Sequence, residues 1–334
     1  MVGRTRLLDG SDVGRPDRPA MPRNRATLLP STAHMRAAAV FGLGCSERNL
    51  RPFQTDKTIE WRIGVPADQD QADVILIFGG DGTIHRHLSQ LVKLELPVLV
   101  VPAGSGNDFA GALGLHRERD SLAVWQEFCA GRGTAKAIDL GFISPLRGNS
   151  GGAPAPRTHT YFCSVAGIGL DAEVARRAHA LPRWLRAHGG YALALIPIIF
   201  RFAPFPIKIL ELDGAGHWSL RSKPTILAAF ANTPAYGGGM KIAPQAQMDD
   251  GQLDVCIISG IDRFKLACMF PTVYFGRHLR IREVDYFQAA HLRVETETPL
   301  ELYADGEYVC QTPVEIGIER GVLLIIVHPS QTSF

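Results

Sequence analysis

The stretch VILIFGGDGTIHRHL, residues 74–88, decides the fold of the chain around it. An apolar run of strand type gives way to Gly79, Gly80 and Gly82, and a helical pattern begins at Thr83. Glycine allows positive φ angles and lets backbone amides come close to an anion. The free N–H groups at a helix start add positive charge at the same place. We therefore expect a buried strand, a phosphate-binding turn and a helix.

Asp81 lies inside this turn and has the wrong charge for a phosphate ligand. Its carboxylate would repel phosphate unless a cation lies between them, which indicates Mg²⁺ or a role in proton transfer. A simpler interpretation is that Asp81 caps the N-terminus of the helix that follows. The residues of this turn leave both interpretations open.

A second stretch, VLVVPAGSGNDFA at residues 98–110, repeats the arrangement. Its apolar run ends before Gly104 and Ser105, and Asn107 and Asp108 open another helix. Ligands of open α/β sheets bind at the carboxyl edge of the parallel strands. Two glycine-rich turns at one such edge would suit a long polyanion such as a nucleoside triphosphate.

Apolar runs bounded by glycine alternate with helical patterns over residues 35–141, which predicts a doubly wound, mostly parallel α/β domain. From 142 to 320 the chain changes to short strands separated by turns, which is typical of an antiparallel β-sandwich. The last apolar strand, in 321–334, would either close this second domain or return to the first. Residues 1–34, rich in arginine and proline, are expected to form a disordered tail.

The composition favours an intracellular globular protein. The 334 residues carry a formal net charge of +2, so nothing in the overall charge suggests a nucleic-acid partner. The six cysteines are scattered without metal-ligand spacing, as expected for free thiols in the cytoplasm. The most apolar late run, residues 191–200, is about half of the ~20 residues that a membrane helix needs.

GGDGT (79–83) followed by PAGSGNDFA (102–110) resembles the diacylglycerol kinase catalytic domain family, the bacterial lipid kinases related to sphingosine and ceramide kinases. Further motifs follow in the order of that family. They are DLG (139–141), FCSVAGIGLDAEV (162–174), YGGGMKIAPQAQMDDGQLDV (236–255) and ADGE (304–307). The resemblance extends from about residue 37 to 327.

The resemblance implies a two-domain kinase whose first domain is similar to NAD kinase and phosphofructokinase. ATP with Mg²⁺ would lie between this domain and a lipid-facing β-sandwich. The acceptor would be a lipid hydroxyl, with diacylglycerol giving phosphatidic acid as the favoured case. The nucleotide-binding residues it implies are Gly79, Gly80, Gly82, Thr83, Gly104, Ser105, Asn107, Asp108 and Asp139, the last supporting the metal through water.

The resemblance also implies a catalytic set. Glu307 would be the general base, with Asp305 beside it and Asp81 at the phosphates. On one strand, residues 305 and 307 would point the same way, although DG is also a strong signal for a hairpin turn. A structural Mg²⁺ site would use the carboxylate of Asp250 and the main-chain carbonyls of two neighbours, Gln247 and Gln252.

The chain departs from the family at two places. GLGCSE (42–47) stands where the family has N-P-x-x-G, and His85 and Arg86 stand where it commonly has Asn-Glu. Such losses would fit an altered substrate or a silent homologue that only binds nucleotide or lipid. We interpret His85 and His87 as surface or packing residues, because residues two apart on a helix face different ways.

Two other enzyme classes remain as alternatives. An NAD kinase-like phosphotransferase shares the GGDG turn but lacks the later motifs. A dinucleotide-binding oxidoreductase would explain GLGCSE, yet the third glycine of its fingerprint is absent.

The lipid substrate would be met at a membrane surface, which implies a peripherally associated protein. Residues 191–205 and 264–275 are either contact surfaces or core helices. The nearby arginines that would suit anionic head groups are Arg183, Arg186, Arg201 and Arg277. The sequence is also compatible with a homodimer.

Overall fold

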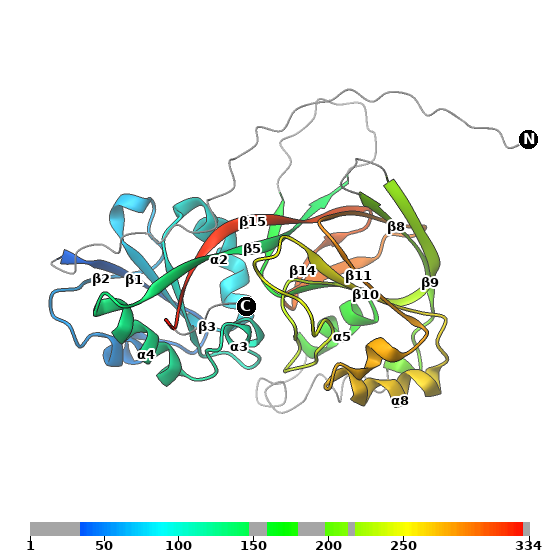
Figure 1. The fold of residues 1–334 in the computed structure, drawn as a ribbon, viewed down its shortest axis with the longest axis horizontal. Coiled ribbons are helices and arrows are strands. Elements are labelled where there is room, and N and C mark those ends of the chain that lie inside the picture. The colour runs from blue at the N-terminus through cyan, green and yellow to red at the C-terminus, as the bar shows by residue number, and fades with distance from the viewer. Residues whose placement is uncertain (1–33, 147–158, 180–197, 213–217, 330–334) are drawn as a thin grey trace, which may run out of the picture.

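The computed structural model describes residues 34–146, 159–179, 198–212 and 218–329 (Figure 1). Residues 1–33 of the expected tail, residues 191–197 of the expected contact segment 191–205, and both Arg183 and Arg186 lie outside the described residues. No helix in the described part of the chain is long and apolar enough to cross a bilayer.

The first domain is built on a parallel sheet in the order β2-β1-β3-β4. Its strands are β1 (Arg36–Phe41), β2 (Glu60–Ile63), β3 (Val74–Gly79) and β4 (Val98–Pro102). Its helices are α1 (Glu47–Leu50), η2 (Arg51–Phe53), η3 (Gln69–Gln71), α2 (Asp81–Leu94), α3 (Asp108–Ala112) and α4 (Glu118–Cys129).

Every residue of β3 and of β4 is buried, as expected for central parallel strands covered on both faces. The apolar stripe of α2, with Ile84, Leu88 and Leu91, packs into the same core. The helix ends at Glu95, whose left-handed backbone (φ 51°) stops it. This packing fixes the start of α2 at the carboxyl edge of the sheet.

The second domain is antiparallel throughout its described strand pairs. Its strands are β6 (Thr160–Phe162), β7 (Val165–Gly169), β8 (Phe205–Leu212), β9 (Trp218–Ala231), β10 (Leu253–Ser259), β11 (Val284–Ala289), β12 (His291–Thr296), β13 (Glu301–Ala304) and β14 (Glu307–Gln311). Its helices include α5 (Leu170–His179), α8 (Arg263–Val273) and the short η4 (Arg277–Arg280).

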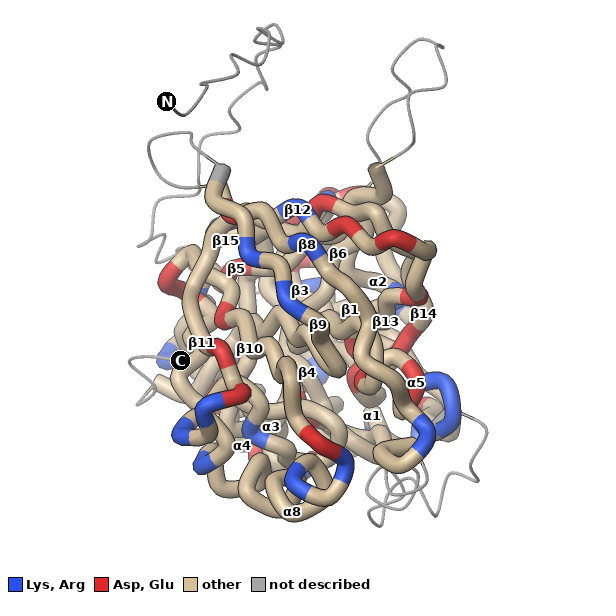
Figure 2. The backbone as a smooth tube through the Cα atoms, turned by 90° about the vertical axis from the view of Figure 1, so that its right-hand side faces the viewer, with Lys and Arg blue, Asp and Glu red and all other residues tan. Residues whose placement is uncertain are grey.

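Alternate residues of β9 belong to two different cores. Ala228 and Phe230 lie in the interior shared by the strands, whereas Leu227 and Ala229 pack under α5 and α8. Figure 2, which faces this domain, shows α8 at one end and β8 and β12 at the other. The predicted fold class, an α/β domain followed by a β-sandwich, is confirmed by this architecture.

Two long strands belong to both domains. β5 (Thr134–Pro145) and β15 (Val314–Val327) pair antiparallel from Val314–Pro145 to Val327–Thr134 and run side by side from one domain to the other (Figure 1). Near its end β15 also pairs in parallel with β4, at Ile325 and Val98. The last strand therefore returns to the first sheet, and the boundaries expected at 141/142 and 320/321 both fall inside strands.

Candidate active site

The two glycine turns lie against each other at the carboxyl edge of the parallel sheet. A Cβ on Gly80 would lie 2.8 Å from the Cα of Gly104, and one on Gly104 would lie 2.4 Å from the Cα of Gly80. Packed atoms do not approach so closely, so neither position has room for a side chain. Asn107 shapes the second turn, since its side chain accepts from the N–H of Gly104 and donates to its carbonyl.

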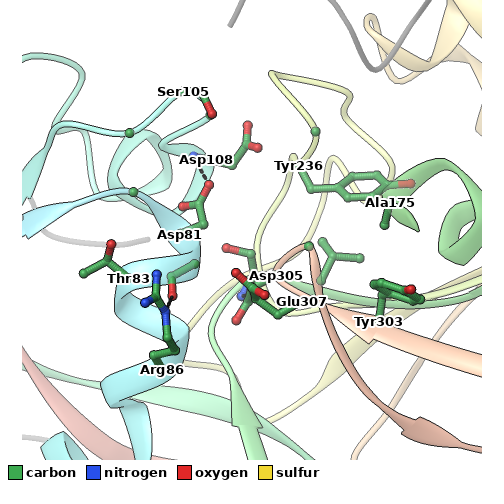
Figure 3. A pocket seen from close by; sticks show the side chains of 18 of the residues that line it. Asp81, Thr83, Arg86, Ser105, Asp108, Ala175, Tyr236, Tyr303, Asp305 and Glu307 are labelled. Carbon is green, nitrogen blue, oxygen red and sulfur yellow. Dashed lines mark hydrogen bonds between the residues drawn. The ribbon is translucent and has the colours of Figure 1, made fainter. Parts of the chain in front are cut away.

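These turns form one wall of a cleft between the two domains (Figure 3). Most of the predicted nucleotide-binding and catalytic residues line it, namely Gly80, Asp81, Gly82, Thr83, Gly104, Ser105, Asp108, Asp305 and Glu307. Gly79 and Asn107 do not line the cleft, but they hold the two glycine turns in place. A Cβ on Gly79 would lie 2.7 Å from the Cβ of Thr83, so this glycine lets β3 and α2 pack closely.

Asp81 caps a helix, but not the one expected. It is the first residue of α2, whose N-cap is Gly80, and its carboxylate accepts from the N–H groups of Asp108 and Phe109 at the start of α3, both at 3.1 Å. The side chain therefore ties the two glycine turns together. Burial, followed by the negative charge of Asp108, raises the pKa of Asp81 to about 7.

Asp108 carries the connection on into the second domain. Its two carboxylate oxygens accept from the N–H groups of Gly238 and Gly239, at 3.0 and 3.1 Å. Both glycines have positive φ angles, 83° and 95°, which let successive N–H groups point at one carboxylate. Burial raises the pKa of Asp108. The chain Asp81–Asp108–Gly238 thus crosses the cleft.

Asp305 and Glu307 occupy a hairpin turn and its exit, so of the two arrangements that the sequence left open the DG turn is confirmed and a single shared strand is not. Asp305 and Gly306 have φ angles of 51° and 82°, and they form the two-residue turn between β13 and β14. The carboxylate of Asp305 is fully buried and accepts from the N–H groups of Cys163 and Ser164 at 2.9 and 2.8 Å. Asp305 therefore anchors the turn that presents Glu307.

Glu307 lies directly against the first turn of α2. A Cβ on Gly82 would lie 2.6 Å from Oε1 of Glu307, so the missing side chain makes room for the carboxylate. Figure 3 shows Glu307 and Asp305 from the second domain facing Asp81 across the cleft. The glutamate expected as a general base thus lies beside the first glycine turn.

His85 is a site residue that the sequence interpretation missed. Its Nδ1 lies 3.0 Å from Oδ2 of Asp305, and its side chain is only 9% exposed. Burial lowers the pKa of His85, but the hydrogen bond and the charge of Asp305 outweigh it and leave the pKa above its usual value. The sequence signal that could have identified His85 as a site residue is its position one helical turn after Asp81, on the same face of α2.

Asp139 does not line the cleft, contrary to its predicted place at the nucleotide. Its carboxylate accepts from the N–H groups of Gly251 and Gly321, both at 2.7 Å, and so joins β5 to β15 and to the turn that carries Asp250. Asp250 in turn accepts from the N–H of Gln252. Asp139 therefore belongs with the predicted structural Mg²⁺ loop, where the guanidinium of Arg320 also lies against Gly251.

An apolar pocket inside the second domain adjoins the cleft. Asp171 and Tyr236 form the shared wall, with a 2.5 Å hydrogen bond from the phenol to the carboxylate. Burial raises the pKa of Asp171 to about 6. Beyond this pair the pocket is lined by apolar side chains from α5, α8, β9 and β10, among them Leu170, Leu227, Ile258 and Met269. Both polar residues lie in motifs that the resemblance had marked.

Comparison with known proteins identifies the class. The model of the diacylglycerol kinase catalytic domain matches residues 49–143, and the model of the YegS C-terminal NAD kinase beta sandwich-like domain matches residues 164–327. These matches divide the chain as its structure does, with the cleft between the two parts. Fold and site together define a two-domain phosphotransferase that uses an alcohol group as acceptor.

Whole-chain relatives agree with the domain matches. The chain is 32% identical over 254 residues to a diacylglycerol kinase of Mycobacterium tuberculosis, covering 76% of each protein, and 28% identical over 245 residues to a diacylglycerol kinase of Bacillus subtilis, covering 73% of this chain and 74% of that one. The chain belongs to the diacylglycerol kinase catalytic domain family, which implies ATP as phosphoryl donor. A crystal structure of a diacylglycerol kinase from Bacillus anthracis shares its fold, with a TM-score of 0.60, 18% identity, and coverage of 89% of this chain and 98% of that one.

Proposed function

We propose that this protein transfers the γ-phosphoryl group of ATP, bound with Mg²⁺, to the hydroxyl group of a membrane lipid, and that the acceptor is diacylglycerol, which gives phosphatidic acid. One observation carries the proposal. The glycine turns that suit phosphate line one cleft together with Glu307, and an apolar pocket adjoins this cleft. The name of the mycobacterial relative supports diacylglycerol as the acceptor.

The apolar pocket supports a lipid acceptor over a polar one. Its lining beyond Asp171 and Tyr236 offers apolar side chains, which favour an acyl chain through burial of hydrocarbon. The two polar side chains stand where the chain would meet its head group. An acceptor placed this way would direct its hydroxyl toward the glycine turns and Glu307.

The acidic residues of the cleft suit Mg²⁺ delivered with ATP. Among the described residues, no three His, Cys, Asp or Glu side chains are arranged to hold a metal ion by themselves. Mg²⁺ ordinarily binds nucleotide phosphates together with one or two protein carboxylates. Asp81, whose pKa is raised by burial and by Asp108, is the carboxylate that a cation would stabilise most, and the ion would screen the phosphates from it.

Glu307 would remove the proton of the acceptor hydroxyl as its oxygen attacks the γ-phosphorus. Phosphoryl transfer needs alignment, charge neutralisation and the loss of this one proton. The anchoring of the hairpin by Asp305 holds Glu307 against Gly82, next to the N-terminus of α2. The base and the phosphate-binding end of the helix are therefore fixed relative to each other.

α8 supplies a surface for the membrane. Its buried face, with Leu266, Met269 and Val273, lines the apolar pocket. On the outside Phe264 and Phe275 are 77% and 73% exposed. The exposed basic residues in and beside the helix are Arg263, Lys265, Arg277, Arg280 and Arg282, against two acids, Asp262 and Glu283 (Figure 2). Exposed rings among cations suit an anionic bilayer.

The proposal is tested by turnover. The purified protein is incubated with γ-labelled ATP, Mg²⁺ and vesicles that contain diacylglycerol, monoacylglycerol, ceramide or phosphatidylglycerol in turn. We expect label in the organic phase, chiefly as phosphatidic acid, and a loss of about 10²- to 10⁴-fold for Glu307→Gln with ATP binding retained. A protein that binds ATP but labels none of these lipids would instead be a silent member of the family.

A further inference from the structure

The charges that line the cleft are unbalanced. Five acidic residues line it, namely Asp81, Asp108, Asp171, Asp305 and Glu307, whereas Arg86 is the one basic residue lining it in the described part of the chain. The glycine turns contribute backbone amides, which are neutral dipoles. A nucleoside triphosphate would bring several more negative charges, and a single Mg²⁺ neutralises only two of them. Arg86 is therefore the protein cation available to the phosphates.

Hydrogen bonding holds Arg86 near the start of α2. Its Nε donates to the carbonyl oxygen of Gly82 at 3.1 Å, so the guanidinium turns back along the helix. Figure 3 shows this side chain running from α2 toward Thr83, at the level of the phosphate-binding turn. Its terminal nitrogens have no hydrogen bond or ion pair with any other described residue. Two donor groups thus remain for a ligand.

Gly82 contacts both Arg86 and Glu307, the proposed base. The Cα of Gly82 is the surface against which the Glu307 carboxylate lies, and the carbonyl of the same residue holds the Arg86 guanidinium. Glu307 marks the place of the attacking hydroxyl in the proposed reaction. Because Gly82 also holds the Arg86 guanidinium, this cation would lie nearer to the transferred phosphoryl group than to the far end of the nucleotide.

We propose that Arg86 is a catalytic residue that binds the γ-phosphoryl oxygens of ATP during transfer. This inference rests on the proposed kinase function and adds a group to it. The acceptor oxygen forms a bond to the γ-phosphorus while the bond to the β–γ bridging oxygen breaks. ADP leaves with that electron pair, and Glu307 takes the hydroxyl proton. The guanidinium stabilises the negative charge on the γ-oxygens throughout.

The position of Arg86 makes the departure from the family pattern understandable. The sequence shows Arg where the family commonly has Glu, a difference that would fit an altered substrate or a silent homologue. In the structure an acid at this place would join five others around the cleft. Arginine instead offers a planar group with two free terminal NH2 groups, which suits phosphate better than the point charge of lysine does.

The test separates phosphate recognition from turnover. Arg86→Gln and Arg86→Lys are compared with the wild type and with Lys93→Gln, which removes a cation from the exposed last turn of the same helix. We expect Arg86→Gln to lower kcat by about 10²-fold, Arg86→Lys to lie between it and the wild type, and Lys93→Gln to match the wild type.

Binding of ADP and of a non-hydrolysable ATP analogue, measured by calorimetry with Mg²⁺, gives the second readout. We expect Arg86→Gln to weaken the analogue several-fold and to leave ADP nearly unchanged. Equal weakening of both ligands, or unchanged kcat in an active enzyme, would overturn the role of Arg86. If the wild type labels no lipid but its preference for the analogue depends on Arg86, the kinase proposal fails while γ-phosphoryl recognition stands.

Discussion

Nδ1 of His85 lies 3.0 Å from Oδ2 of Asp305, and this contact joins the first turns of α2 in one domain to the β13–β14 hairpin of the other. Asp305 is also held by the N–H groups of Cys163 and Ser164 and by the thiol of Cys163, so four groups contact its carboxylate. Glu307, the proposed base, lies two residues after Asp305. The contact therefore fixes the position of Glu307 relative to α2. We therefore expect His85 to have a positioning role.

Replacement of His85 tests this role. We expect His85→Ala to lower kcat about tenfold with an unchanged KM for ATP, because Glu307 loses its fixed place and the glycine turns do not. His85→Asn should recover most of the loss, since the amide nitrogen of asparagine can donate from nearly the position of Nδ1. Steady-state kinetics of the two variants measures both kcat and the KM for ATP. An asparagine variant as slow as the alanine variant would rule out positioning.

The same pair has a pH signature. The pKa of His85 is raised in the folded protein, so the pairing stabilises fully below the unfolded pKa of about 6.5 and is lost as pH rises through the folded value. Thermal unfolding of the wild type and of His85→Ala should therefore differ more at pH 6 than at pH 9. Parallel curves across this range would contradict the raised pKa.

Gly82→Ala should separate activity from stability. Alanine favours the helix by up to about 1 kcal/mol relative to glycine, so the Tm should hold or rise. The new Cβ would lie 2.6 Å from Oε1 of Glu307, however, and would displace the base. We expect kcat to fall about 10- to 100-fold. Gly111→Ala in α3 is the control, because a Cβ there meets only ordinary contacts, 3.7 Å from His116. Equal kinetics for both variants would place Glu307 outside the reaction.

Asp81 should make nucleotide binding depend on pH. Its pKa of about 7 means that the free protein holds a proton there which most carboxylic acids have already lost. Because a raised pKa stabilises the protonated native state, the contribution of Asp81 to stability falls as pH rises from about 4 through 7. Binding of Mg·ATP should favour the ionised form and release this proton.

Calorimetry in buffers of different ionisation enthalpy measures that release. We expect the affinity for Mg·ATP to weaken toward tenfold per pH unit below about pH 7, and the slope to flatten in Asp81→Asn. The comparison with the variant removes the titration of ATP itself. An identical pH slope in both proteins would leave Asp81 as a helix cap alone.

The α8 surface should govern vesicle binding. We expect Phe264→Ser with Phe275→Ser to weaken binding to anionic vesicles by about tenfold for each ring, since each would lose burial of its hydrocarbon. Leu220→Ser is the matched control, because Leu220 is 60% exposed but lies on β9. Activity on a short-chain, soluble acceptor should stay unchanged. Equal vesicle binding by the double variant and the control would remove α8 from the membrane surface.

Much of the phosphate-binding wall could be predicted from the sequence because its parts are local. A strand that ends in glycine and a helix that starts after it are encoded within about ten residues, so GGDGT and GSGND each predicted a turn. The fold class and the family followed from the order of such motifs. The two turns meet because parallel strands place their carboxyl ends at one edge.

The errors concern contacts between distant segments. In the simpler interpretation Asp81 would cap α2, and it caps α3 instead because the second turn lies against the first. Asp139 was placed at the nucleotide, but pairing of β5 with β15 holds it beside Gly251. His85 was interpreted as a surface or packing residue. The sequence could not reveal its hydrogen-bond partner, Asp305, which lies 220 positions away. No local pattern encodes such contacts.

By itself, the sequence determined the elements, their order and the chemistry of each turn, since backbone preferences and apolar periodicity act over a few residues. The tertiary structure alone decided which turn faces which. The return of β15 to the first sheet and the packing of the hairpin on α2 bring Glu307 to Gly82, because strand pairing across the whole chain closes the cleft. The same packing turned a basic residue that departs from its family, Arg86, into a candidate ligand for phosphate.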